Sequence, residues 1–181
     1  MKKSLASVFL AVVLLLLGTS VASANGTGWY SIWAGQNMLA GIFQVVPYGD
    51  NAIKIQIIPV QGWKLTESHI EVVTDPTLFP INNGGNPAPG QFRWAQKSAP
   101  STVPHEYVIP YADIPSVSGA TVYIAVHVVV VKTDIYGNII QDETGWGGPC
   151  DTDWNPSLPL PTGFWKIGAS RWGYYFSFVL P

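Results

Sequence analysis

Cysteine is nearly absent from this sequence, which has one such residue, Cys150, among 181. A single cysteine excludes an intramolecular disulfide, so the fold must be stabilised by packing. Side chains suited to packing are abundant, because the sequence contains eight Trp, eight Tyr and seven Phe residues. We interpret Cys150 as a buried thiol that packs like a small apolar residue, the alternative being a cross-link between two copies.

Charge is also scarce, since only 11% of the residues are charged. Nine Lys and Arg residues stand against eleven Asp and Glu residues, which gives a formal net charge of −2. A protein that binds nucleic acid needs a basic face that neutralises phosphates. With so few basic residues, we expect no nucleic-acid partner.

Long apolar runs are missing except near the N-terminus. There, two lysines precede an apolar run at residues 9–17, and the sequence ASA at 22–24 has the pattern of a signal-peptidase site. The apolar run is shorter than the roughly 20 residues that span a bilayer. We therefore predict a signal peptide at residues 1–24 and a secreted, extracellular mature chain, residues 25–181, without a membrane span. The alternative is an uncleaved anchor.

Helical periodicity is absent after the leader, where short apolar runs alternate with Pro, Gly and Asn. This pattern predicts an all-β fold, a single antiparallel β-sandwich of about eight or nine strands, Ig-like or jelly-roll-like, in one domain. Two long Pro/Gly-rich loops are expected at 74–91 and 147–166. The strand-like runs are residues 28–33, 38–46, 52–60, 63–73, 105–111, 120–132, 138–146 and 171–180.

Six segments of the sequence together resemble a known module. They are GWKLTESHIEVV, GNPAPGQF, YVIPYADIP, VYIAVHVVV, ETGWG and WGYYFSFVL, in that order, within residues 62–180. The order is similar to that of a β-sandwich module of uncharacterised secreted and cell-surface prokaryotic proteins, with the pattern W-x-L-T-E-S-H … G-N-P-x-P-G-Q-F … A-x-H … E-T-x-W-G. The resemblance implies a location and a fold rather than an activity. The chain departs from this pattern at GGPCDTDWNPSLPLPTG, where the family has a short Gly-rich turn.

The stretch WKLTESHIEVV places polar residues inside an apolar strand. Period-two alternation predicts that His69 shares one strand face with Leu65, Glu67 and Glu71. A second histidine, His127, lies within the most apolar strand-like run, so the two imidazoles can meet if these strands are neighbours.

Two interpretations of these polar residues remain open. A structural polar network that fixes the strand register would satisfy buried polar groups. A metal site would use two imidazoles and a carboxylate, as Zn²⁺ sites do. The candidates for the network are Thr66, Glu67, His69, His127 and Glu143, and those for the metal are His69, His127 and Glu143.

Catalytic motifs are missing. The sequence has no G-x-S-x-G elbow, and HEYVI at residues 105–109 lacks the second histidine of HExxH. Glu67 and Glu71 lie four residues apart on a strand, about 13 Å at 3.3 Å per residue, which is too far for a pair of glycosidase carboxylates. We therefore predict that the protein is not an enzyme.

The second long loop and its borders carry the remaining candidates. Asp151 and Asp153 begin like a Ca²⁺ loop, but Pro follows where an EF-hand needs Gly, so the choice is a looser Ca²⁺ site or a solvated acidic turn. No other cofactor is expected. The tryptophans Trp146, Trp154 and Trp165 are candidate ligand-binding residues that would stack on sugar rings, the alternative being burial beneath the loop.

The low charge and the β-rich sequence favour a non-catalytic extracellular structural or adhesive surface protein, such as a self-assembling filament or surface-layer subunit. Its partners would be copies of itself or cell-surface polymers. The segment GWYSIW, residues 28–33, would pair within its own sheet or be donated to a neighbour's sheet edge. Two alternatives are a carbohydrate-binding module that uses the three tryptophans and a secreted metal-dependent hydrolase that uses His69, His127 and Glu143.

Overall fold

A computed structural model describes residues 28–35, 37–114, 119–148, 163–167 and 171–181 of the chain. The expected signal peptide, Cys150 and the predicted Ca²⁺ ligands Asp151 and Asp153 lie outside these residues. The predicted all-β fold is confirmed. The strands are β1 (Gly28–Ala34), β2 (Met38–Tyr48), β3 (Ala52–Pro59), β4 (Lys64–Val73), β5 (Trp94–Ser101), β6 (His105–Pro110), β7 (Thr121–Thr133), β8 (Ile139–Gly148), β9 (Gly163–Ile167) and β10 (Arg171–Val179).

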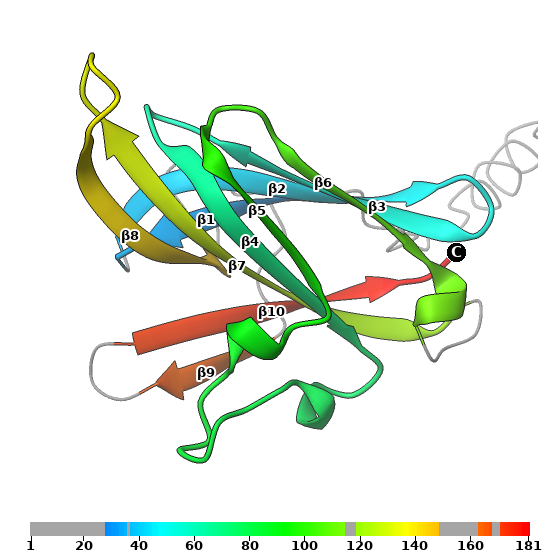
Figure 1. The fold of residues 1–181 in the computed structure, drawn as a ribbon. Helices are drawn as coiled ribbons and strands as arrows, with labels where there is room; N and C mark the ends of the chain where they lie inside the picture. The colour runs from blue at the N-terminus through cyan, green and yellow to red at the C-terminus, as the bar shows by residue number, and fades with distance from the viewer. Residues whose placement is uncertain (1–27, 36, 115–118, 149–162, 168–170) are drawn as a thin grey trace, which may run out of the picture.

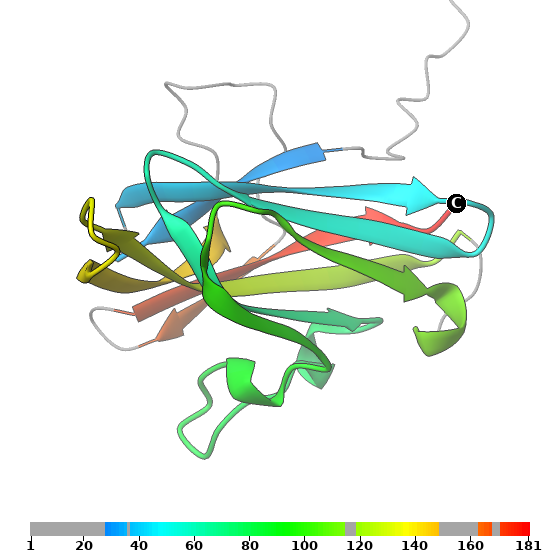
Figure 2. The same ribbon diagram turned by 45° about the horizontal axis from the view of Figure 1, so that its top comes forward.

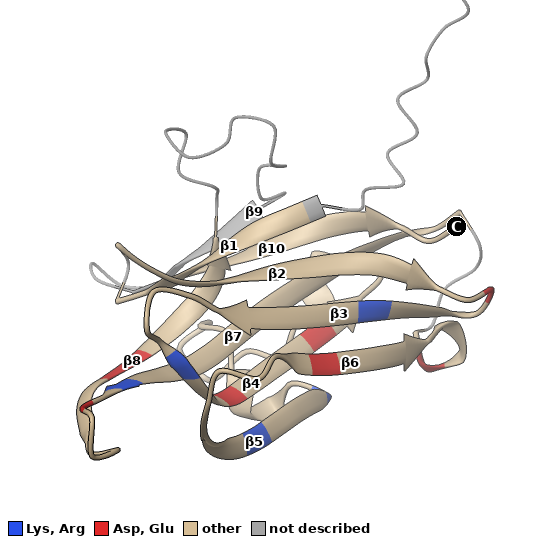
Figure 3. Cartoon of the chain, turned by 90° about the horizontal axis from the view of Figure 1, so that it is seen from above, with Lys and Arg blue, Asp and Glu red and all other residues tan. Residues whose placement is uncertain are grey.

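Short 3-10 helices interrupt the strands at three places, namely η2 (Pro76–Leu78), η3 (Pro89–Gln91) and η4 (Tyr111–Asp113). No helix in the described part of the chain has the length and apolar character needed to cross a membrane. Figure 3 shows the few charged residues scattered over the strands and turns.

The strands form one antiparallel sheet in the order β5-β4-β7-β8-β1-β2-β3-β6, and β9 and β10 branch from it at β7. The branch arises because β8 pairs with residues 127–133 of β7, whereas β10 pairs with residues 121–125 of the same edge. Figures 1 and 2 show that the sheet folds over, and in Figure 2 β1, β2 and β3 lie above β7 and β10. The fold is therefore a nearly closed, sandwich-like sheet.

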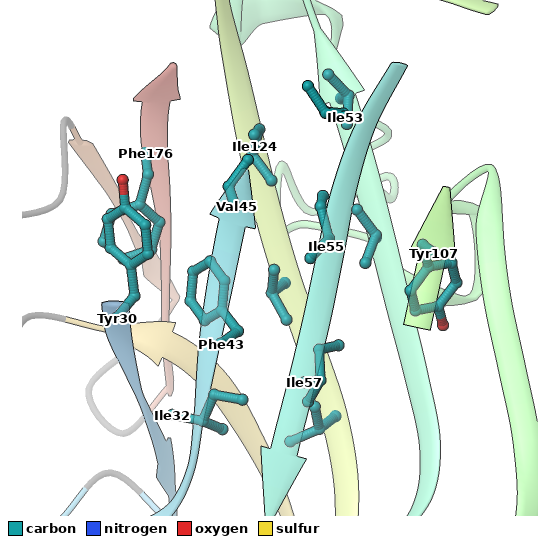
Figure 4. Packing of buried hydrophobic residues seen from close by; sticks show 14 of the residues in the cluster. Tyr30, Ile32, Phe43, Val45, Ile53, Ile55, Ile57, Tyr107, Ile124 and Phe176 are labelled. Atoms are coloured by element: carbon teal, nitrogen blue, oxygen red, sulfur yellow. The ribbon is translucent and has the colours of Figure 1, made fainter. Parts of the chain in front are cut away.

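The apolar alternation of the sequence explains which side chains fill the space between the two layers. Ile53, Ile55 and Ile57 of β3 are fully buried, whereas Lys54 and Gln56 between them are not. Strand β7 is apolar at both parities and is buried on both faces, as its sequence predicts. Figure 4 shows β3 and the aromatic residues Tyr30, Phe43 and Phe176 in this core.

A second, smaller apolar cluster lies on the opposite face of the sheet. It contains Val73, Phe79, Phe92, Ala125 and Trp146. Phe79 and Phe92 come from the segment between β4 and β5, which corresponds to the predicted loop 74–91 and carries η2 and η3. This loop therefore covers one outer face of the sheet.

Two strands were missed by the sequence prediction. Strand β5 is largely exposed and pairs only with β4, so its sequence lacks the apolar alternation that marks a half-buried strand. Strand β9 overlaps the end of the segment 147–166 that was expected to be a loop, and β8 extends into the start of this segment as far as Gly148.

The predicted segment GWYSIW pairs within its own sheet. Strand β1 pairs with β2 along its whole length and with β8 over Ser31–Ala34. In this structure the segment is thus an internal strand of the sheet.

Candidate functional site

A β-bulge in β4 decides which way the polar residues of this strand point. Leu65 lies opposite Val130 of β7 and Glu67 lies opposite Val129, so Thr66 is the extra residue. Leu65 consequently belongs to the main core with the even-numbered residues Ile70 and Val72. The prediction that His69 shares a face with Leu65 is therefore wrong.

His69 and His127 are cross-strand partners in the register of β4 and β7. Their ring centroids lie 5.7 Å apart, and that of His127 lies 4.9 Å from the ring of Trp146, its partner on β8. Trp146 is only 8% exposed and contacts the ring of Phe92 at 6.2 Å. The three side chains form a row on the outer face of the sheet, and Trp146 is buried rather than open for stacking on a sugar.

Burial determines the protonation state of His127. It lowers the pKa of this imidazole to about 4, His69 adds to the effect, and Glu67 opposes it. The Nδ1 atoms of both histidines are buried and accept no hydrogen bond from the described residues. His127 is therefore a neutral ring that packs against its neighbours at physiological pH.

Glu67 lies beside the histidine row and contacts a basic side chain through each of its two carboxylate oxygens. Its carboxylate contacts His69 Nε2 at 3.1 Å and Lys97 Nζ at 2.8 Å. These contacts, the one to Lys97 first, lower the pKa of Glu67. Thr66 Oγ1 donates to the Val129 carbonyl at 3.1 Å.

Glu143 lies away from the two histidines. It is opposite Val130 of β7, a residue of the main core, whereas His127 is opposite Trp146 on the other face. Its Oε1 accepts a hydrogen bond of 3.4 Å from Gln141. The structure thus separates Glu143 from the other four candidate network residues. Among all described residues, no group of three His, Cys, Asp or Glu side chains is arranged to hold a metal.

A buried polar network that the sequence analysis missed lies on the inner face of β4. Ser68 Oγ lies 2.7 Å from His105 Nδ1 and 2.6 Å from the hydroxyl of Tyr107, and His105 Nε2 lies 3.2 Å from Ser98 Oγ. Burial lowers the pKa of His105, which favours the neutral ring. Both ring nitrogens are satisfied if Ser68 donates to Nδ1 and Nε2–H donates to Ser98. The sequence did contain a sign of this network. Ser68 is separated from the core residues Ile70 and Val72 by even spacings, which places all three on the same face of the strand.

Glu71 of β4 connects the sheet to the loop between β4 and β5 by a hydrogen bond. This buried carboxylate accepts a hydrogen bond from the Val72 amide at 3.1 Å and one from the Arg93 amide at 2.9 Å. Beside it lies a pocket of about 490 Å³ between the end of β4 and the loop. We call it the loop pocket; its lining includes Val73, Thr74, Leu78, Pro80, Gln91 and Arg93.

The turn between β7 and β8, which joins two of the predicted strand-like runs, exposes apolar side chains. Ile135 is 91% and Tyr136 is 84% exposed, and more than half of Ile139 and of Ile140 is also exposed. We call these four residues the hairpin tip. Figure 1 shows that this hairpin projects from the body of the sheet. The signal in the sequence was an apolar residue on each side of a turn motif, in DIYGNII.

The remaining candidates fall largely outside the described residues. Trp154, Asp151 and Asp153 lie in the segment that is not described, and Trp165 lies within β9. No protein-family model matches the chain. No curated protein and no solved structure matches it either.

Proposed function

We propose that the protein is a non-catalytic, extracellular structural or adhesive protein that associates with copies of itself or with cell-surface polymers. The observation that carries this proposal is the hairpin tip. Four large apolar side chains are exposed on one projecting hairpin, and a concentration of exposed apolar residues is a feature of interaction sites in soluble proteins.

The location proposed for the protein rests on its N-terminal sequence. A basic start, a short apolar run and the ASA site are the pattern of an exported chain. The resemblance of residues 62–180 to secreted and cell-surface modules supports the same location.

The placement of the reactive residue types supports a structural role. His105 and Ser68 are almost fully buried and hydrogen-bonded to each other, so a substrate has no access to them. His69 and His127 pack with Trp146 beneath Phe92, while Glu143 lies on the other face. These positions suit residues that specify a unique sheet.

The carbohydrate-binding alternative now depends on two tryptophans, because Trp146 is covered. Binding of the purified protein to a panel of immobilised polysaccharides, compared with that of Trp154→Ala and Trp165→Ala variants, separates this alternative from self-association. Binding that disappears in both variants would favour the carbohydrate-binding module.

Self-association is tested directly on the mature chain, residues 25–181. We expect particles larger than one protomer in light scattering and in negative-stain micrographs as the protein concentration rises. Isolated single protomers at millimolar concentration, together with no binding to cell-surface polymers, would contradict the proposed function.

A further inference from the structure

We propose that copies of this protein join head to tail, with the hairpin tip of one copy seated in the loop pocket of the next. This inference rests on the proposed function, since it names the surfaces through which copies associate. It commits to a second copy of this chain as the occupant of the pocket.

The hairpin tip is a rigid, convex element. The Gly137 amide donates to the Asp134 carbonyl at 3.1 Å, and Gly137 adopts a φ of +88°, which favours glycine. Asp134 Oδ1 accepts hydrogen bonds from the amides of Tyr136 and Asn138 at 2.9 and 2.8 Å. The backbone of the turn is thus held by hydrogen bonds before any partner binds, so little backbone freedom is lost on binding.

The loop pocket is a concave element whose lining is partly apolar and partly polar. Val73 and Pro80 line it, and Leu78 lies at its edge with 59% of its surface exposed. Ile81, on the same loop, is 54% exposed. Its volume of about 490 Å³ lies in the range of roughly 300–1,000 Å³ that is usual for sites that enclose a ligand.

The two surfaces lie at opposite ends of the β4–β7 ribbon. Lys64, at the start of β4, pairs with Val131 close to the tip, and Val73, at the end of β4, pairs with Tyr123 beside the pocket. Ten strand residues separate these ends, on the order of 30 Å. A contact between two different surfaces of one molecule is heterologous, and when it does not close into a ring it generates an open chain of copies.

The charges beside the two surfaces are complementary. Asp134 flanks the tip, and hydrogen bonds, first from the Asn138 side chain, lower its pKa and keep it ionised. Arg93 lines the pocket and is exposed, and its guanidinium lies over the Trp94 ring at 4.9 Å and donates to the Asp113 carbonyl at 2.5 Å. Glu71 also lines the pocket, but its carboxylate is buried and bonded to two backbone amides, so Arg93 carries the exposed charge. Opposite charges at the edges of an apolar contact steer association and fix its register.

The area of the tip argues against a two-fold dimer made by two tips. Four partly exposed side chains on a turn offer a few hundred Å², well below the roughly 800 Å² that each partner buries in a stable interface. A convex tip that enters a concave pocket also buries the walls of the pocket and the exposed loop residues Leu78 and Ile81. A contact between a tip and a pocket therefore uses both apolar surfaces, which a contact between two tips does not.

The test uses two variants, each of which removes one surface. In the tip variant, Ile135→Ser and Tyr136→Ser are combined; in the pocket variant, Leu78→Ser and Arg93→Glu are combined. Val103→Ser is the matched control, because Val103 is 68% exposed and belongs to neither surface. Association is measured by sedimentation velocity and light scattering of the mature chain.

We expect each variant alone to associate only at a protein concentration at least about tenfold higher than the unmodified chain requires. Each variant loses central apolar contacts. The Val103→Ser control should associate like the unmodified chain. An equimolar mixture of the two variants should form particles of two protomers and grow no further, because one intact tip and one intact pocket remain. Formation of this pair also shows that both variants are folded.

Three results would overturn the inference. If either variant alone associates like the unmodified chain, the contact lies elsewhere, although the proposed self-association stands. If the mixture remains monomeric while the unmodified chain assembles, the two surfaces do not meet. If the unmodified chain remains monomeric, the inference fails. The proposed function then stands only if the protein binds cell-surface polymers.

Discussion

Single polar residues inside this sheet have different tasks on its two faces. On the inner face, Ser68 bridges His105 and Tyr107, and each of these groups depends on it for a hydrogen bond. On the outer face, His127 packs between His69 and Trp146 as a neutral ring. The first position is sensitive to loss of a hydroxyl, and the second is sensitive to pH.

Replacing Ser68 by Ala should destabilise the protein by about 1–3 kcal/mol, because it leaves His105 Nδ1 buried without its hydrogen-bond partner. The free energy of unfolding is measured by urea denaturation. Thr102→Ala is the control, since Thr102 is exposed, and its change should stay within about 0.5 kcal/mol. Equal effects of the two substitutions would show that the network contributes nothing.

Acid should destabilise the protein through His127. The pKa of this residue is about 4 in the folded chain and about 6.5 in the unfolded chain, so between these values only the unfolded chain takes up the proton. Stability from this group is fully present above pH 6.5 and is lost as the pH falls towards 4. The lowered pKa of His105 acts in the same direction.

Urea denaturation at pH 7.5 and 4.5 measures this loss, which should be about 2–3 kcal/mol for His127. In His127→Gln the difference between the two pH values should shrink by that amount. A variant that keeps the full pH dependence would show that folding does not lower the pKa of His127.

Strands and loops were predictable from the sequence where burial imposes a pattern. The alternation in β3 and the apolar run of β7 predicted those strands correctly, because one face or both faces are buried. Strand β5 was missed, since an exposed edge strand imposes no such pattern. The bulge at Thr66 was also invisible, and this one extra residue reversed the predicted face of Leu65.

The candidate site was predictable only in part, for a related reason. The sequence allowed His69 and His127 to meet if their strands were neighbours, and the structure pairs these strands and brings the two rings together. Glu143 lies on the face opposite to the two histidines. This placement follows only from the register of β7 and β8, and no short sequence motif contains that information. The partners of Ser68 lie 37 and 39 residues away in the sequence.

Strand β8 packs closely against the core at Gly147. A Cβ atom at this position would lie 2.7 Å from Phe43 and 3.2 Å from Phe176, whose rings are held in the core. Gly147→Ala should therefore destabilise the protein by about 1–3 kcal/mol. Gly90→Ala is the matched control, because a Cβ there meets nothing within 4 Å. Thermal unfolding of both variants compares the two sites, and equal midpoints would contradict this packing.

The loop between β4 and β5 should loosen when Glu71 is replaced by Gln. The amide group of Gln can accept only one of the two hydrogen bonds that Val72 and Arg93 donate, so about 1–3 kcal/mol of stability is lost. Limited proteolysis should then cut the loop faster. Glu106→Gln, an exposed carboxylate on β6, should leave the cleavage rate nearly unchanged.

As a whole, the molecule is a sheet that almost closes on itself. Its two outermost strands in the main path are β5 and β6, and a side-chain bond spans the gap, in which Gln96 Nε2 donates to the Glu106 carbonyl at 2.6 Å. Strand β7 lies at the branch and is paired on both edges. The backbone amides of β7 should therefore be the best protected against local unfolding, and the protection should decrease towards the gap between β5 and β6.

Amide hydrogen exchange tests this gradient. We expect the central amides of β7 to exchange at least about 100-fold more slowly than those of β5, which is paired on one edge only. Uniform protection across β7 and β5 would mean that the sheet opens as one unit.

The branch at β7 has a consequence for the time at which this protein can fold. One edge of β7 at residues 121–125 has no strand partner until β10 is present. Strand β10 also contributes Phe176 and Phe178 to the core. A ribosome releases β10 well after β7, so the nascent chain emerges without the strand that completes its sheet. We therefore expect the sheet to remain incomplete until the last strand of the chain has been synthesised.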